Sequence, residues 1–170
     1  MNKDEFAKLV ENTIEEGGLL AMLYFDIHGP DPEGLKGTMA EFISKLSGVE
    51  GVVYSFGEIQ PPLKMEDEEL YSTMSEVYVL AKDFPTLSFI SLNYSPVSID
   101  IMKPEKDFKM SITDIEKTLG RLAHFSLTFT STYLTKVLKP EEREKYLKKL
   151  RFREERGKEM LKKSGVNKHE

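Results

Sequence analysis

The chain of 170 residues contains no cysteine, which excludes disulfides, thiolate nucleophiles and cysteine-based zinc sites. It also lacks any apolar run close to the roughly 18–20 residues that a membrane-spanning helix requires. Residues 1–18 are charged and amphipathic, unlike a secretory signal peptide. We therefore expect a cytoplasmic protein with no membrane partner.

Recognisable catalytic motifs are missing as well. The sequence has no glycine-rich phosphate loop, no histidine-rich metal motif and no nucleophile elbow. No residue can be assigned a catalytic role on this basis, and no cofactor is indicated. The pattern favours a non-catalytic protein over an enzyme.

The charge is divided unevenly along the chain. The net charge is −5, yet residues 139–170 hold twelve Lys and Arg against seven Asp and Glu, a balance of +5, so that residues 1–138 carry −10. In "EEREKYLKKL" (141–150), acidic and basic residues recur at i,i+4 spacing, which is typical of a solvated helix. A nucleic-acid arm is usually more purely basic and carries stacking aromatics. Nucleic-acid binding through residues 139–163 is therefore an alternative, as is contact with the acidic region of another subunit.

The first 110 residues predict a regular succession of helices and strands. Residues 3–16 have helical periodicity and are followed by two glycines, and Asp31 and Pro32 are a natural N-cap and first residue for a second helix. The segment 84–96 is ambiguous between a short helix and a strand. The expected elements are helices over 3–16 and 31–47 and strands over 19–28, 51–60, 75–83 and 97–104.

Residues 111–138 carry two conflicting patterns. The stretch "FSLTFTSTYLT" (125–135) alternates with period two and is rich in threonine, which is typical of a strand. An unbroken stripe at helical spacing nevertheless runs through the whole segment, and we favour one long helix. Its residues are Ile112, Ile115, Leu119, Leu122, Ser126, Phe129, Tyr133 and Val137. A second, mostly polar helix follows from Lys139-Pro140 to about residue 163.

This order of elements predicts an α+β fold of the ferredoxin-like βαββαβ type. Its two right-handed βαβ units would form a four-stranded antiparallel sheet in the order 4-1-3-2, with one face covered by helix 31–47 and segment 84–94. We expect an N-terminal helix in residues 1–18, a ferredoxin-like domain in residues 19–110 and a helical extension in residues 111–170.

The order and lengths of these segments, over residues 19–138, resemble those of ACT-like regulatory domains. The run "YSPVSIDIMKP…DIEKTLGRLAHF" is similar to that of an uncharacterised archaeal family with this core and a long C-terminal helix. The resemblance implies the fold far more than the function. "HGPDPEG" (28–34) departs from the glycine-containing ligand turn of amino-acid-binding ACT domains, because it also holds two prolines.

Strand alternation places a set of polar residues on the face away from the helices. The antiparallel order is expected to bring together, at one end of the sheet, Asp26, His28, Glu58, Glu76 and Asp100. Oxygen ligands with one imidazole suit Mg²⁺, Mn²⁺ or zinc, and clustered carboxylates raise one another's pKa. One hypothesis is therefore a metal-assisted or acid/base enzyme, in which a divalent cation would be the cofactor.

The favoured hypothesis is structural. Helix 111–138 would cover the same face, and Lys117, Arg121 and His124 would pair with the carboxylates at its rim. A subunit interface over this face is the third possibility. Taken with the missing motifs, the sequence favours a non-catalytic homo-oligomer, a dimer or trimer, that binds a small molecule or a partner in a regulatory or scaffolding role.

Overall fold

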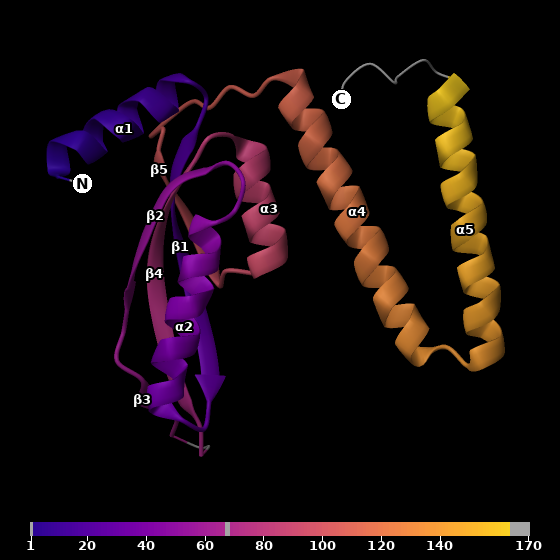
Figure 1. The fold of residues 1–170 in the computed structure, drawn as a ribbon, viewed down its shortest axis with the longest axis horizontal. Coiled ribbons are helices and arrows are strands. Elements are labelled where there is room, and N and C mark those ends of the chain that lie inside the picture. Colours follow the sequence, from indigo (N-terminus) through magenta and orange to yellow (C-terminus); the bar gives the residue numbers. More distant parts are fainter. Residues whose placement is uncertain (1, 67–68, 164–170) are drawn as a thin grey trace. The chain divides into compact units, whose positions relative to one another are not determined.

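The protein has an α+β fold with an antiparallel sheet. The computed structural model describes residues 2–66 and 69–163, which contain five helices and five strands (Figure 1). The chain divides into two compact units, residues 1–123 and 124–170. In chain order the elements are α1 (Lys3–Glu15), β1 (Leu19–Gly29), α2 (Pro32–Ser47), β2 (Val52–Ile59), β3 (Leu63–Lys64), β4 (Tyr71–Ala81), α3 (Phe84–Tyr94), β5 (Ser98–Lys103), α4 (Ile112–Val137) and α5 (Pro140–Lys163).

The sheet is built around β1 and β4. The strand order is β2-β4-β1-β5, with β3 paired to β4 beside β2, and every pairing is antiparallel. β1 pairs with β4 along its whole length, whereas β5 pairs with β1 from Leu20 to Tyr24. The predicted four-stranded sheet was wrong in strand number, because the chain between β2 and β4 adds the two-residue strand β3.

Local capping explains where the two helices next to the sheet begin. Asp31 accepts a hydrogen bond from the backbone N–H of Glu33, and Pro32 takes the first helical position of α2, as predicted. Asp83 caps α3 by accepting from the backbone N–H of Thr86 at 2.7 Å and from its hydroxyl at 2.6 Å. The ambiguous segment is therefore a helix.

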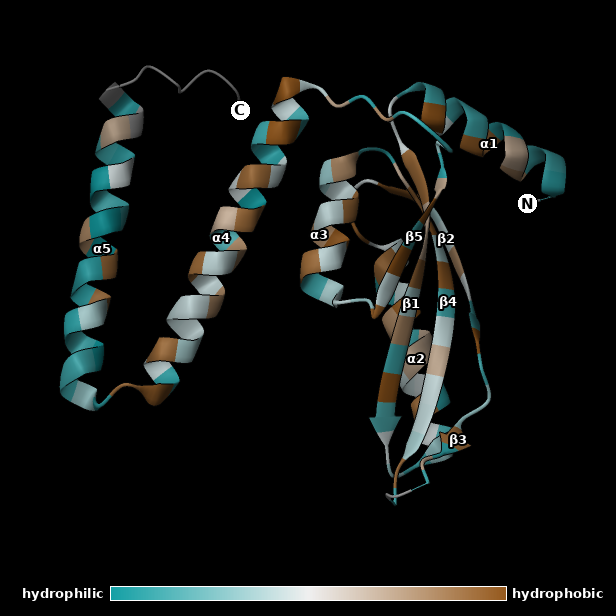
Figure 2. Ribbon diagram, turned by 180° about the vertical axis from the view of Figure 1, so that it is seen from behind, coloured by the Kyte–Doolittle hydropathy of each residue, from teal (hydrophilic) through white to brown (hydrophobic). Residues whose placement is uncertain are grey.

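The core lies between the sheet and these two helices. Alternate residues of β1, including Leu23 and Phe25, are buried together with Met39 and Leu46 of α2 and Ile90 of α3. α2 and α3 cover this face of the sheet in both ribbon views (Figures 1 and 2). On the opposite face, Phe6 of α1 packs against aromatic side chains of β2.

Residues 112–137 form one continuous helix, so the prediction of a long helix over the ambiguous threonine-rich segment is confirmed. In the second unit, Tyr146 of α5 and Ser131 of α4 are linked through their hydroxyls at 3.2 Å. α5 carries i,i+4 ion pairs, Glu144 with Lys148 and Glu154 with Lys158, at 3.0 and 2.7 Å. The hydrogen bond from Lys158 lowers the pKa of Glu154. In the described ranges, no helix is both long and apolar enough to cross a membrane.

Candidate functional site

Two of the predicted site residues, Asp26 and His28, lie together near the end of β1. Nε2 of His28 is 2.9 Å from Oδ2 of Asp26. The other carboxylate oxygen of Asp26 accepts a hydrogen bond of 2.7 Å from the hydroxyl of Ser72 on β4. The pair is thus held in place by the neighbouring strand.

The other three predicted residues do not join this pair, and the expected cluster at one end of the sheet is not formed. Glu76 lies opposite Tyr24 on one side and Glu58 on the other, and Asp100 lies opposite Met22. The reason is the register: β4 begins at Tyr71, earlier than the predicted start, so Glu76 falls in the middle of the strand. Across the described part of the chain, no three His, Asp or Glu side chains are grouped to hold a metal ion.

The face of the sheet away from α2 and α3 combines aromatic rings with carboxylates. Phe56 and Tyr78 stack with ring centroids 4.6 Å apart, and Phe6 of α1 lies 5.8 Å from Phe56. Tyr24 lies between the strands that carry Glu76 and Asp100. Partial removal from water, followed by the charges of these two carboxylates, raises the pKa of the Tyr24 hydroxyl.

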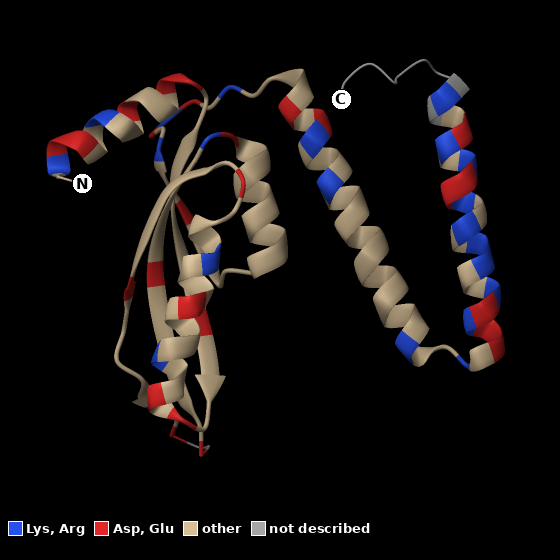
Figure 3. Cartoon of the chain, viewed as in Figure 1, with Lys and Arg blue, Asp and Glu red and all other residues tan. Residues whose placement is uncertain are grey.

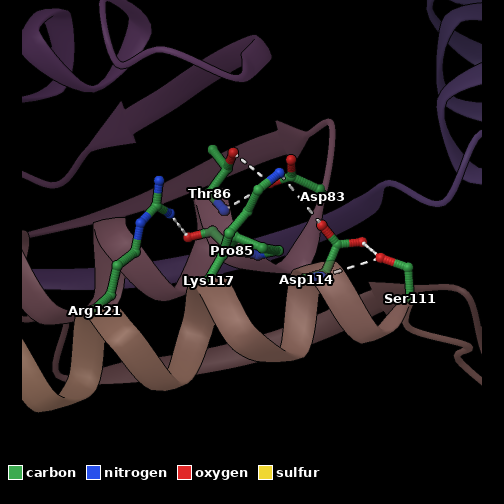
Figure 4. Close-up of polar contacts among 7 residues, drawn as sticks. All are labelled: Asp83, Pro85, Thr86, Ser111, Asp114, Lys117 and Arg121. Atoms are coloured by element: carbon green, nitrogen blue, oxygen red, sulfur yellow. Dashed lines mark hydrogen bonds and ion pairs between the residues drawn. The ribbon is translucent and has the colours of Figure 1, made fainter. Parts of the chain in front are cut away.

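Lys117 and Arg121 face α3 rather than the carboxylates of the sheet (Figure 4). Nζ of Lys117 is 4.0 Å from Asp114, and Arg121 donates a hydrogen bond to the carbonyl of Pro85. The Arg121 guanidinium also lies 5.4 Å from the centre of the Phe89 ring. The predicted pairing of these two residues with sheet carboxylates is therefore wrong.

An apolar groove lies beside the first part of α4. A cavity of about 330 Å³ is lined by residues of α3, β5 and α4. Ile99 and Ile101 of β5, which share the register of buried Leu23 and Ala21, line it together with Thr118 and Leu122. The first part of α4 therefore lies beside α3 and β5, on the helical side of the sheet. The buried hydroxyl of Thr118 has no hydrogen-bond partner among the described residues.

His124, the third predicted rim residue, belongs to the second unit. There it lines a hollow of about 620 Å³ between α4 and α5, with Leu127 and Thr128 on one helix and Leu150 and Arg153 on the other.

A larger cleft in the first unit gathers basic side chains from separate segments. It has a volume of about 700 Å³ and lies where the end of α2, the following turn, the start of α3 and the first part of α4 meet. Four cationic side chains line it: Lys45, Lys82, Lys117 and Arg121. Because these residues are scattered over the sequence, no local motif could have indicated the cleft.

The turn between α2 and β2 forms a fixed wall of this cleft. The backbone N–H of Lys82 donates a 2.9 Å hydrogen bond to the carbonyl of Gly51. Gly51 has a φ of +93°, and a Cβ at this position would lie 2.3 Å from the hydroxyl of Thr86. Only glycine therefore allows the turn to approach the start of α3 this closely.

Exposed apolar side chains also form a row along α4, which we call the α4 stripe. Its members are three or four residues apart, except for Leu122 and Phe129, which are seven residues apart with Ser126 between them. Its apolar members are all exposed to solvent: Ile112, Ile115, Leu119, Leu122, Phe129, Tyr133 and Val137. Figure 3 shows the long uncharged stretch of α4 between Arg121 and Lys136 beside the dense charges of α5.

A family model matches residues 20–167, which span both units. The chain belongs to the MJ0538 family. This uncharacterised family is named after a Methanocaldococcus protein, in agreement with the expected resemblance to an uncharacterised family. Searches of curated proteins and of solved structures gave no match. The region matched by the MJ0538 family includes the cationic cleft and the α4 stripe, whereas Phe6 lies outside it.

Proposed function

We propose that this protein is a non-catalytic, self-associating binding protein with a ferredoxin-like, ACT-like core, acting in a regulatory or scaffolding role. The strand arrangement supports the choice of core. When the two-residue β3 is set aside, the remaining strands in chain order are β1, β2, β4 and β5, and their order across the sheet corresponds to 4-1-3-2. α2 and α3 connect these strands as the crossover helices of the two βαβ units do.

The α4 stripe is the observation that carries self-association. Spacings of three and four residues along one helix are typical of helices that pair with another helix over a long seam. The second half of the stripe is strongly exposed: Phe129 at 65%, Tyr133 at 60% and Val137 at 57%. A long apolar surface without charge is costly in water and marks an interaction site. A second copy supplies an identical stripe, so that a two-fold pairing would be self-complementary.

Light scattering coupled to size exclusion tests this proposal. The wild-type chain is expected to run as a dimer or trimer, and Phe129→Glu is expected to shift it to the monomer, because a carboxylate cannot be buried in an apolar seam without a large cost. Phe152→Glu is the matched control: Phe152 is also 65% exposed and lies on α5, outside the stripe.

A strictly monomeric wild-type protein would overturn self-association. So would equal dissociation of the Phe129→Glu and Phe152→Glu variants, since that would show a general effect of added charge. Far-ultraviolet circular dichroism of both variants establishes that the helices are intact in the samples that are compared.

The two other hypotheses from the sequence receive less support. The enzyme hypothesis retains the Asp26–His28 pair, while the remaining carboxylates lie elsewhere on the sheet. For nucleic-acid binding, the basic side chains of α5 are mixed with acidic ones, and two of them, Lys148 and Lys158, form i,i+4 ion pairs within the helix.

A further inference from the structure

We propose that the cationic cleft of the first unit binds a small phosphorylated molecule. The four cationic residues Lys45, Lys82, Lys117 and Arg121 would contact its phosphate groups. This inference rests on the binding role proposed above, but it is independent of self-association through the α4 stripe.

The first argument is the concentration of positive charge. Residues 1–123 hold eleven Lys and Arg against twenty-two Asp and Glu. Four of those eleven cations nevertheless line this one cleft, which includes two carboxylates, those of Glu50 and Asp83. A strongly acidic unit that places four of its eleven cations in one hollow has a local preference for anions there, opposite to its overall charge.

The second argument is that these lysine and arginine side chains have N–H donors available to bind a ligand. Within residues 2–66 and 69–163, Lys45 and Lys82 take part in no ion pair. Lys117 is 4.0 Å from Asp114, at the outer limit of such a contact. Arg121 uses one terminal nitrogen for the carbonyl of Pro85, whereas a guanidinium has five N–H donors.

The cleft holds four cationic side chains against two carboxylates, and one of the two, that of Asp83, also has a structural role. It accepts hydrogen bonds from the backbone N–H and the hydroxyl of Thr86 at the start of α3 (Figure 4). Asp83 is therefore the N-cap of α3. Its charge still opposes the cations, and the excess of positive charge in the cleft comes from four cations facing two carboxylates.

The size and the lining of the cleft indicate the chemical class of the ligand. Its volume of about 700 Å³ lies within the range of about 300–1,000 Å³ that is usual for small-molecule sites. Beside the cations, the cleft is lined by Phe89, Tyr94 and Val49, which suit an organic group. Lysine and arginine side chains together are the usual partners of phosphate oxygens. A phosphate ester or a nucleotide fits both parts of the lining.

Isothermal titration calorimetry with the full chain tests the proposal, using pyrophosphate and ADP as probes, with a chelator present and at low salt. Both probes are expected to bind, and raised salt is expected to weaken binding through screening. The double variant Lys45→Gln/Lys82→Gln should weaken the binding of both probes by about tenfold or more, since it removes two charge-assisted contacts. Lys117→Gln is a separate variant that should also weaken binding.

The matched control is Lys8→Gln/Lys36→Gln, which removes the same charge from exposed sites on α1 and α2 outside the cleft. Its affinity should stay within about twofold of the wild type. The absence of binding by both probes would overturn the proposal, as would unchanged binding by the Lys45→Gln/Lys82→Gln variant. Equal weakening by the control pair, or tighter binding of succinate than of pyrophosphate, would also overturn it.

Light scattering on the same samples separates this result from the proposed self-association. The cleft variants are expected to keep the wild-type mass. A monomeric wild-type chain that binds pyrophosphate through Lys45 and Lys82 would overturn the dimer or trimer and support the cleft. A dimer or trimer that binds neither probe would support self-association and overturn the proposal for the cleft.

Discussion

The two faces of the sheet differ sharply, although the same strands supply both. On β1, Leu23 is fully buried against the helical layer, while its neighbours Met22 and Tyr24 on the other face are only half-buried. α2 and α3 cover the first face, whereas α1 covers one end of the second. We therefore expect the helical face to contribute more to stability than the other face. The other face can carry aromatic and acidic side chains at little cost to the fold.

The largest loss of stability is expected from Leu23→Ala. Leu23 is 0% exposed, so the variant loses the transfer energy of the removed atoms and leaves a cavity. We expect the free energy of unfolding to fall by about 3 kcal/mol, as measured by urea denaturation. Met22→Ala, one residue away on the other face, is the matched control and should cost less than about 1 kcal/mol.

Similar losses for Leu23→Ala and Met22→Ala would show that the two faces of the sheet contribute equally to stability. That outcome would mean that the second face is also covered, for example in an oligomer. Repeating both measurements over a range of protein concentrations distinguishes this case, because the stability of an oligomer depends on concentration.

A smaller effect is expected from Phe6→Ala, which removes the cover of the second face. The ring of Phe6 lies 5.5 Å from that of Tyr54 and 5.8 Å from that of Phe56. Loss of these aromatic contacts should lower the free energy of unfolding by about 1.5 kcal/mol in urea denaturation. Amide hydrogen exchange should quicken in α1 and stay unchanged in α2.

Phe152→Ala is the control for Phe6→Ala, because it removes an aromatic ring that makes little contact in the folded chain. Its effect on unfolding should be within about 0.5 kcal/mol of zero. Should Phe6→Ala prove equally neutral, α1 would not be held by its aromatic contacts.

The local features of the fold could be predicted from the sequence, and the register could not. Asp31 and Pro32 fixed the start of α2, and the alternation of β1 identified which residues face the helices. The start of β4 was missed, because "YSTM" (71–74) follows an acidic stretch and lacks a strong apolar alternation. This difference moved Glu76 from the expected end of the sheet to its middle, beside Tyr24.

The same limit applied to the candidate sites. Lys117 and Arg121 were predicted as residues of the sheet-covering helix that pair with carboxylates. Their partners depended on which side of the sheet α4 would lie, and sequence spacing does not contain that information. Lys45 and Lys82 were missed because neither belongs to a motif. They approach the other two cations through the turn at Gly51, whose close contact with Thr86 is a tertiary feature.

The smallest predicted effect concerns Tyr24 and the pH dependence of stability. Partial removal from water and the charges of Glu76 and Asp100 raise the pKa of its hydroxyl in the folded state above the ordinary value of about 10. Between the two pKa values the folded chain holds a proton that the unfolded chain has lost. The free energy of unfolding therefore falls as the pH rises through this range, whereas below it the contribution of Tyr24 is fully present.

The Tyr24→Phe variant should lack this part of the decline in urea midpoints measured from neutral to alkaline pH. Glu76→Gln removes one of the two charges that face Tyr24, so the pKa of Tyr24 should move back toward its ordinary value and the decline should become shallower. An identical alkaline decline in the wild type and in Tyr24→Phe would show that the carboxylates of this face do not act on Tyr24. The face would then lack the electrostatic coupling that distinguishes it from the apolar face beneath α2 and α3.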